Sequence, residues 1–148
     1  MSLIGSTNEE KIWNYLKAKG LPDCGIAGLM GNLYAESCLI PTNLQNSYEK
    51  TLGFTDAAYT AAVDKGTYQN FVKDSAGYGL AQWTYWSRKK NLLDFAKKKG
   101  KSIGDLEMQL DFLWNELQGY KAVISALKTA KTVRAASDSV LANFERPA

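Results

Sequence analysis

The chain has 148 residues, of which 45% are hydrophobic and 22% charged, values typical of one folded globular domain and not of a disordered chain. It contains no histidine, which excludes histidine-based catalysis and most zinc sites. The net charge of +3 is too small to identify a partner, and no apolar run approaches the roughly 20 residues that span a membrane.

The two ends of the chain predict its organisation. Residues 1–6, beginning "MSL", are interpreted as a vector-derived remnant or a linker, and residues 7–148 as a single domain. The N-terminus lacks a basic flank followed by an apolar core, so no signal peptide is expected. The domain is expected to be part of a larger protein.

The first forty residues predict two helices. Thr7 and Glu10 have the spacing of a capping box, which opens a helix that ends at Gly20. Asp23 is the expected N-cap of the second helix. Apolar residues of that helix recur at helical spacing, and small or polar residues beside them are expected to leave an open surface. The apolar residues are Ile26, Leu29, Met30 and Leu33, and the flanking residues are Gly25, Gly28 and Asn32.

The rest of the chain predicts one irregular region followed by further helices. Residues 39–76 lose helical periodicity and are expected to form an irregular lobe, with a short hairpin near Gly77–Trp83. Helical patterns return at 87–99, after Ser102 up to Gly119, at 120–130 and at 133–144. The expected fold class is α+β, mostly α, with a helical core and a lobe that form a cleft.

Glu36, in the stretch "AESCLIPTNLQN", is the first candidate functional residue. It lies seven positions after Leu29 and therefore at the border of the buried stripe. Pro41 and the loss of periodicity beyond Cys38 place it in the last helical turn, where the helix dipole disfavours an anion by about 0.3–1 kcal/mol. Partial burial would raise its pKa further, as a general acid requires. The alternative is a solvated glutamate.

The stretch "GYGLAQWT", residues 77–84, is the second candidate. Its glycines permit a sharp turn and close backbone approach to a ligand. The amide of Gln82 between Tyr78 and Trp83 suits carbohydrate, since aromatic faces stack on sugar rings and amides bind their polar groups. The alternative is a hairpin with a buried tryptophan.

The two stretches together resemble the lysozyme and lytic transglycosylase superfamily, in which a helix-ending Glu-Ser precedes Gly-Leu-x-Gln. With "AGLMGNLYAESCLIPTNLQN", Arg88 and "LEMQLDFLWNEL" at 106–117, the chain from about Glu10 to its C-terminus resembles the phage-tail lysozyme family. The resemblance implies a lysozyme-like fold that cuts peptidoglycan glycan strands. It implies that Glu36 is the general acid and that Gln82, and more loosely Tyr78 and Trp83, line the substrate cleft.

The step after proton delivery stays open. A hydrolase with two carboxylates needs the second within about 5–9.5 Å of the first. Asp74 is the first choice, with a turn-forming role as the alternative, and Glu49, Asp56 and Asp64 are weaker candidates. Some lysozyme relatives use one glutamate and position water with neutral groups, and lytic transglycosylases use a hydroxyl of the substrate. The neutral candidates here are Asn43, Gln45 and Thr84.

Other conspicuous residues receive simpler interpretations. Arg88 follows the glycine turn and is expected to contact substrate or brace Asp74. Trp13, Trp86 and Trp114 are interpreted as core or helix-packing residues. Two cysteines, Cys24 and Cys38, are interpreted as partly buried thiols, with one disulfide as the alternative.

Two further classes of function remain as alternatives: a non-catalytic cell-wall glycan-binding module and a basic helical nucleic-acid binder. The small net charge disfavours the second, so no nucleic-acid partner is expected. No cofactor, metal or membrane insertion is expected, and the isolated domain is expected to be a monomer. The predicted place of action is the cell wall, outside the cell or by delivery through a phage or conjugation apparatus.

Overall fold

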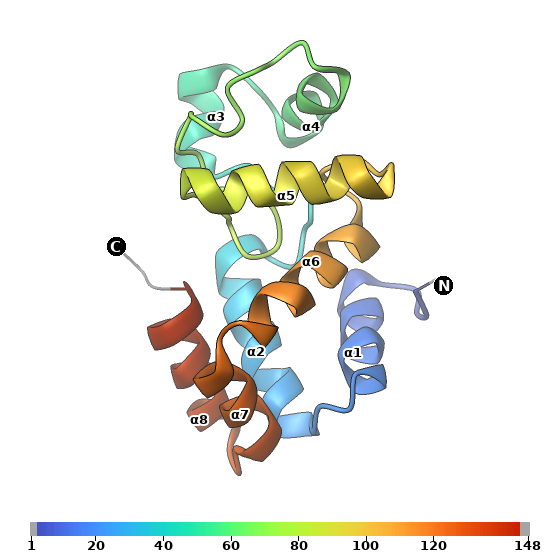
Figure 1. The fold of residues 1–148 in the computed structure, drawn as a ribbon, viewed down its shortest axis with the longest axis vertical. Coiled ribbons are helices and arrows are strands. Elements are labelled where there is room, and N and C mark those ends of the chain that lie inside the picture. Colours follow the sequence, from blue (N-terminus) through green and yellow to red (C-terminus); the bar gives the residue numbers. More distant parts are fainter. Residues whose placement is uncertain (1–2, 146–148) are drawn as a thin grey trace. The chain divides into compact units, whose positions relative to one another are not determined.

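The computed structural model describes residues 3–145, and these residues are mostly helical (Figure 1). Residues 1 and 2 of the predicted remnant, and the last three residues, lie outside the described part. The helices are α1 (Asn8–Ala18), α2 (Asp23–Ser37), α3 (Asn46–Leu52), α4 (Asp56–Lys65), α5 (Trp86–Lys99), α6 (Leu106–Gln118), α7 (Lys121–Thr129), α8 (Val133–Val140) and a π-helical turn, η1 (Leu141–Glu145).

The chain forms two compact units. One unit contains the chain up to Leu39 and from Leu113 onward, and the other is Ile40–Phe112. The prediction of a single domain over residues 7–148 stays a prediction. Glu36 belongs to the first unit, and the turn at residues 77–84 belongs to the second.

In the first unit, α2 is the central helix and packs against α1, α7 and α8 (Figure 1). The predicted open surface on its flank is wrong, because α7 and α8 cover it. A Cβ at Gly25 would lie 2.0 Å from the Leu127 carbonyl oxygen, and one at Gly28 would lie 2.5 Å from the Ala136 Cβ. The small residues of α2 are therefore contact points for neighbouring helices, which approach too closely for any side chain.

The second unit contains two helices, α3 and α4, in the segment predicted to be irregular. Their capping residues explain why they form. Thr55 accepts a hydrogen bond from the Ala58 N–H at 3.1 Å, and Gly53 and Gly66 end the two helices in the left-handed conformation. Helices of 7 and 10 residues are too short to show a clear apolar period, so the sequence pattern did not reveal them.

The predicted helix boundaries hold elsewhere, with one correction. Thr7 caps α1 by accepting from the Glu10 N–H at 3.1 Å, and Gly100 ends α5 in the left-handed conformation. Asp23 is the first residue of α2 and not its N-cap, which is Pro22. The Asp23 carboxylate instead pairs with Lys17 at 2.5 Å.

The expected hairpin at Gly77–Trp83 is reduced to a single antiparallel bridge. Tyr78 and Trp83 exchange two backbone hydrogen bonds of 3.1 and 2.9 Å, and a second bridge pairs Tyr78 with Leu44. Within residues 3–145 no segment forms a named strand. Nor is any helix in that range long and apolar enough to cross a membrane.

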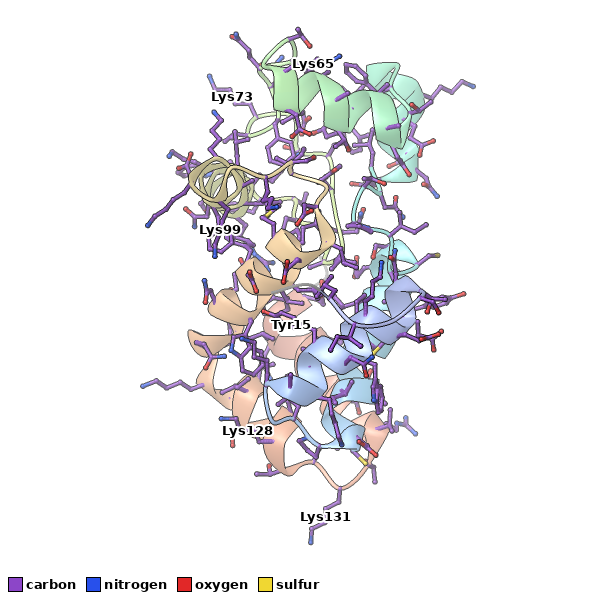
Figure 2. The ribbon with its side chains drawn as sticks, turned by 90° about the vertical axis from the view of Figure 1, so that its right-hand side faces the viewer. Tyr15, Lys65, Lys73, Lys99, Lys128 and Lys131 are labelled. Carbon is purple, nitrogen blue, oxygen red and sulfur yellow. The ribbon has the colours of Figure 1, made fainter. Side chains whose placement is uncertain are left out.

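Basic side chains are spread over each unit. Lys65, Lys73 and Lys99 of the second unit point into solvent, as do Lys128 and Lys131 of the first (Figure 2).

Candidate functional site

Glu36 lies in the last turn of α2, next to an unusual helix end. Cys38 ends the helix in the left-handed conformation, with φ of 55°, and its N–H donates to the Tyr34 carbonyl oxygen at 2.8 Å. Leu39 follows with φ of 61°. Glu36 is an exposed residue, and partial burial raises the pKa of its carboxyl above the usual value for glutamate. A carboxyl with a raised pKa is suited to donating a proton.

Left-handed backbone outside glycine is concentrated in two places. Four such residues occur between residues 3 and 145, namely Cys38, Leu39, Ser75 and Gln82. Cys38 and Leu39 lie two and three residues after Glu36, whereas Ser75 lies just before the glycine turn and Gln82 lies within it. Each such conformation costs on the order of 1 kcal/mol or more, and strain of this kind gathers at functional sites. Both candidate stretches therefore have backbone that the fold must hold in place.

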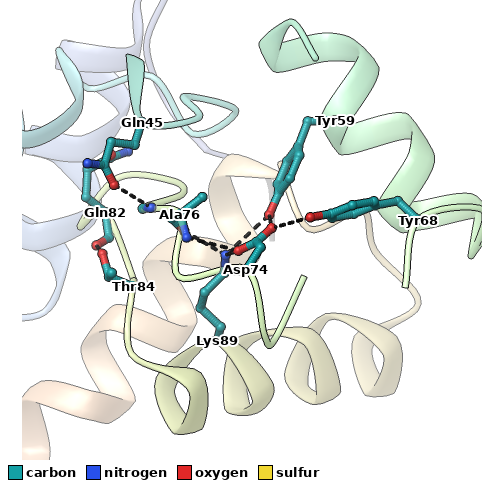
Figure 3. Close-up of polar contacts among 9 residues, drawn as sticks. Gln45, Tyr59, Tyr68, Asp74, Ala76, Gln82, Thr84 and Lys89 are labelled. Carbon is teal, nitrogen blue, oxygen red and sulfur yellow. Dashed lines mark hydrogen bonds and ion pairs between the residues drawn. The ribbon is translucent and has the colours of Figure 1, made fainter. Parts of the chain in front are cut away.

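Gln45 is tied to the start of the glycine turn by short hydrogen bonds (Figure 3), and Gln82 forms further bonds from within the turn. The Gly77 N–H donates to Gln45 Oε1 at 2.9 Å, and the Gln45 N–H donates to the Gly77 carbonyl at 2.7 Å. Gln82 Nε2 donates to the carbonyl oxygens of Asn43 and Gly79, at 2.9 and 3.0 Å. The structure thus brings Gln82, a predicted residue of the substrate cleft, together with Asn43 and Gln45, two of the neutral residues predicted to bind substrate or position water.

Gly77 is required where these amides converge. A Cβ there would lie 2.8 Å from Gln82 Oε1 and 3.2 Å from both Gln45 Oε1 and Thr84 Oγ1. No real Cβ makes a contact as short as the first without displacing its neighbour. The position therefore favours glycine for close packing of polar groups, and not for a special φ angle.

The aromatic residues of the turn are buried, which corrects the expectation that they stack on sugar. Trp83 and Tyr78 are fully buried. The Trp83 ring packs edge-on against Phe112, with ring centroids 5.4 Å apart. The Tyr78 hydroxyl shares a hydrogen bond of 2.5 Å with Thr60. Both rings support the turn from within the unit and offer no open face to a ligand.

Asp74 lies at the centre of a buried network just before the turn (Figure 3). Its Oδ2 accepts from the hydroxyls of Tyr59 and Tyr68, at 2.7 and 2.8 Å. Its Oδ1 accepts from Lys89 Nζ at 2.6 Å and from the Ala76 N–H at 3.0 Å. Lys89 Nζ also donates to the Ala76 carbonyl at 2.6 Å. Burial raises the pKa of both tyrosines well above the usual range, which keeps them protonated as donors.

This network does not suit Asp74 to activate water. Its side chain is 4% exposed, and both oxygens are occupied by two donors each. Lys89 braces Asp74 through an ion pair of 2.6 Å. Lys89 is fully buried, and the burial lowers its pKa while Asp74 opposes that change. The contacts of Asp74 therefore favour a structural role over a catalytic one.

The importance of Lys89 was missed, although the sequence contained a signal. Lys89, Leu92 and Ala96 recur at helical spacing, and all three are buried on one face of α5. Lysine on an apolar stripe predicts a buried charge with a partner.

The weaker acidic candidates are also engaged in polar contacts. Asp64 accepts from the Ser102 hydroxyl and from the Ile103 N–H, the latter at 2.9 Å. Asp56 accepts from the Leu44 N–H at 3.0 Å. The pKa of Glu49 is raised, first by a hydrogen bond with the Asp56 carboxylate and then by burial. None of the three is singled out as the second carboxylate.

Two other sequence interpretations need correction. Trp86 is 55% exposed and therefore not a core residue, whereas Trp13 and Trp114 are half-buried. Both cysteines are free thiols, as predicted, but Cys38 is exposed and only Cys24 is partly buried.

Comparison with known proteins supports the family that the order of the sequence motifs predicts. The model of a family described as phage tail lysozyme matches residues 7–148. The chain belongs to the phage tail lysozyme family. Its mostly helical structure is consistent with a helical fold of the lysozyme type, and membership indicates a lysozyme-like enzyme that acts on peptidoglycan.

One curated relative is a longer phage protein. The chain is 26% identical over 151 residues to morphogenesis protein 1 of Bacillus phage B103, an alignment that covers 97% of this chain. It covers 34% of the relative, so the chain spans about a third of that protein's length.

Proposed function

We propose that this domain cleaves the glycan strands of peptidoglycan, with Glu36 as the general acid. The observation that supports this most directly is the coincidence of strained backbone with both family motifs. Each non-glycine left-handed residue within 3–145 lies either two or three residues after Glu36 or beside or within the glycine turn. Strain in these positions costs stability, and strain of this kind gathers at functional sites.

Glu36 would act on the glycosidic oxygen. The protonated carboxyl donates its proton to that oxygen as the bond to the anomeric carbon breaks, and the sugar left behind develops oxocarbenium character. Burial raises the pKa of Glu36, so a larger share of the enzyme holds the proton near neutral pH. Glu36 is left as a carboxylate that accepts a proton in the next step.

The glycine turn would bind a glycan strand. Gln45 and Gln82 each use part of their amide to hold the turn, which fixes their orientation. A side chain held in this way loses little freedom when it binds hydroxyl or N-acetyl groups. Asn43 and Arg88 complete the proposed binding set. Tyr78 and Trp83 act through the turn that they support.

The engagement of Asp74 favours a mechanism with a single carboxylate. In one route a water molecule attacks the anomeric carbon and returns a proton to Glu36. In the other, a hydroxyl of the substrate attacks, which makes the enzyme a lytic transglycosylase. In both routes Glu36 recovers the proton that it donated, so the enzyme returns to its starting protonation state.

Mass spectrometry of the fragments released from purified peptidoglycan tests this proposal. Reducing ends with one added water identify hydrolysis, whereas anhydro-muramic ends identify transglycosylation. Glu36→Gln is the control and should release neither. Fragments from a folded Glu36→Gln protein would exclude Glu36 as the general acid. If the wild-type protein released no fragments, the proposed cleavage would be wrong, and a non-catalytic glycan-binding module would be the remaining interpretation.

We also propose that residues 7–148 act as one lysozyme domain of a larger protein at the cell wall. Morphogenesis protein 1 of Bacillus phage B103 supports this arrangement, because the chain spans only about a third of its length. Delivery by a phage or conjugation apparatus would bring the domain to its substrate.

A further inference from the structure

Two neighbouring aromatic side chains lie exposed directly after the glycine turn. Tyr85 is 64% exposed and Trp86 is 55% exposed. Their ring centroids are 6.1 Å apart, and the ring planes are tilted by 37°. Large aromatic side chains are usually buried for most of their area, so an adjacent pair held open to solvent suggests a binding role.

Local backbone structure explains why the pair points outward. Tyr85 has extended backbone, with φ of −65° and ψ of 140°, and precedes the first residue of α5, which is Trp86. The buried face of that helix starts later, at Lys89, and continues through Leu92 and Ala96. Trp86 itself stays 55% exposed at the start of the helix.

The size of the exposed pair selects among ligands. Two aromatic side chains at these exposures present roughly 200 Å² of surface. A stable protein interface buries about 800 Å² on each partner, so the pair is too small to form one. A membrane surface requires a free apolar helix face, and the apolar face of α5 is already buried in the unit. A small flat ligand fits these limits.

Polar groups beside the pair point to a sugar ring. Thr84 immediately precedes Tyr85 and donates through Oγ1 to the Gln82 carbonyl at 2.8 Å, which links the pair to the turn. The Gln82 side chain is itself held by Asn43 and Gly79. An aromatic face with a hydroxyl and an amide nearby matches a pyranose, whose C–H face stacks and whose substituents hydrogen-bond.

We propose that Tyr85 and Trp86 form a stacking platform for a pyranose ring of the glycan, extending the binding surface of the turn. The choice of a peptidoglycan glycan as the source of that ring rests on the proposed function. The platform belongs wholly to the second unit and requires nothing of Glu36. It also explains why tryptophan occurs twice within four residues, since Trp83 supports the turn and Trp86 faces solvent.

Binding measured without cleavage tests the platform. In the Glu36→Gln background, co-sedimentation with purified peptidoglycan and calorimetry with soluble N-acetylglucosamine oligomers would give Kd values. Trp86→Ala should weaken binding at least tenfold, and Tyr85→Ala by a smaller factor. Trp86→Phe should restore part of the loss, because it keeps a stacking face. Leu141→Ala is the matched control, since Leu141 is an apolar side chain of the other unit with 44% exposure.

The outcomes separate this proposal from the proposed catalysis. Unchanged Kd values for both Trp86→Ala and Tyr85→Ala would overturn the platform, whatever the activity of the enzyme. An equal loss in Leu141→Ala would also overturn it, because the effect would not be local. Persistent cleavage by Glu36→Gln would instead overturn the catalytic assignment while leaving the binding result intact.

Discussion

Lys89 Nζ lies 2.6 Å from Asp74 Oδ1, and both side chains are almost wholly buried. The same ammonium lies 4.3 Å from the centroid of the Phe71 ring. Through Ala76, which bonds to Asp74 by its N–H and to Lys89 by its carbonyl, the pair fixes the backbone directly before Gly77. An ion pair inside the unit thus holds the start of the turn that we propose binds glycan.

Breaking this ion pair should destabilise the protein strongly. Lys89→Met leaves the Asp74 carboxylate buried without its cation, which typically costs about 3–5 kcal/mol. Urea unfolding of the variant measures this loss. Lys90→Met is the matched control, because the neighbouring Lys90 forms an exposed pair with Asp94 and should change stability little.

The double variant Asp74→Leu with Lys89→Met distinguishes a specific pair from general damage. If the two charges stabilise each other, the double variant should lose less stability than the two single variants added together. A strictly additive loss would show that the two residues act independently.

Glu36→Gln should abolish most wall lysis while the protein stays folded. The substitution keeps the shape of an exposed side chain but removes the proton donor, and general acid catalysis contributes typically about 10²–10⁴-fold. Turbidity loss of a cell-wall suspension measures the rate, and a thermal melt confirms folding. Glu9→Gln, another exposed glutamate of the same unit, should lyse walls at the wild-type rate.

The activity should depend on pH in the direction set by Glu36. Burial raises the pKa of this carboxyl, so its proton is retained to higher pH than in an exposed glutamate. The general acid is active when protonated. The rate should therefore be full below the raised pKa and fall as the pH rises through it. A profile of kcat/KM against pH on a soluble glycan measures this, and a rate that rises through the same range would contradict the role.

Gly77→Ala should weaken glycan binding and lower stability. The added methyl would lie 2.8 Å from Gln82 Oε1, so the amide must move away from its hydrogen bonds to Asn43 and Gly79. Calorimetry and urea unfolding measure the two effects. Gly31→Ala is the matched control, since a Cβ there meets no other described atom within 4 Å. It should stabilise α2 by roughly 0.5–1 kcal/mol. Wild-type binding by Gly77→Ala would mean that the turn tolerates the displaced amide.

The amino-acid sequence by itself determined the parts that depend on neighbours along the chain. Thr7 and Gly100 mark helix ends because a cap acts on backbone groups within a few residues. The position of Glu36 in the last turn of α2 follows from the same local rules. The order of the motifs was enough to predict the family, which the match over residues 7–148 confirms.

Only the tertiary structure decided which side chains are covered. Helical spacing and residue type did not distinguish Trp83, buried against Phe112, from Trp86, which is open to solvent. Nor did they pair Lys89 with Asp74, fifteen residues earlier along the chain. Burial and charge pairing depend on segments that are distant in sequence, and a local pattern contains no information on where those segments will lie.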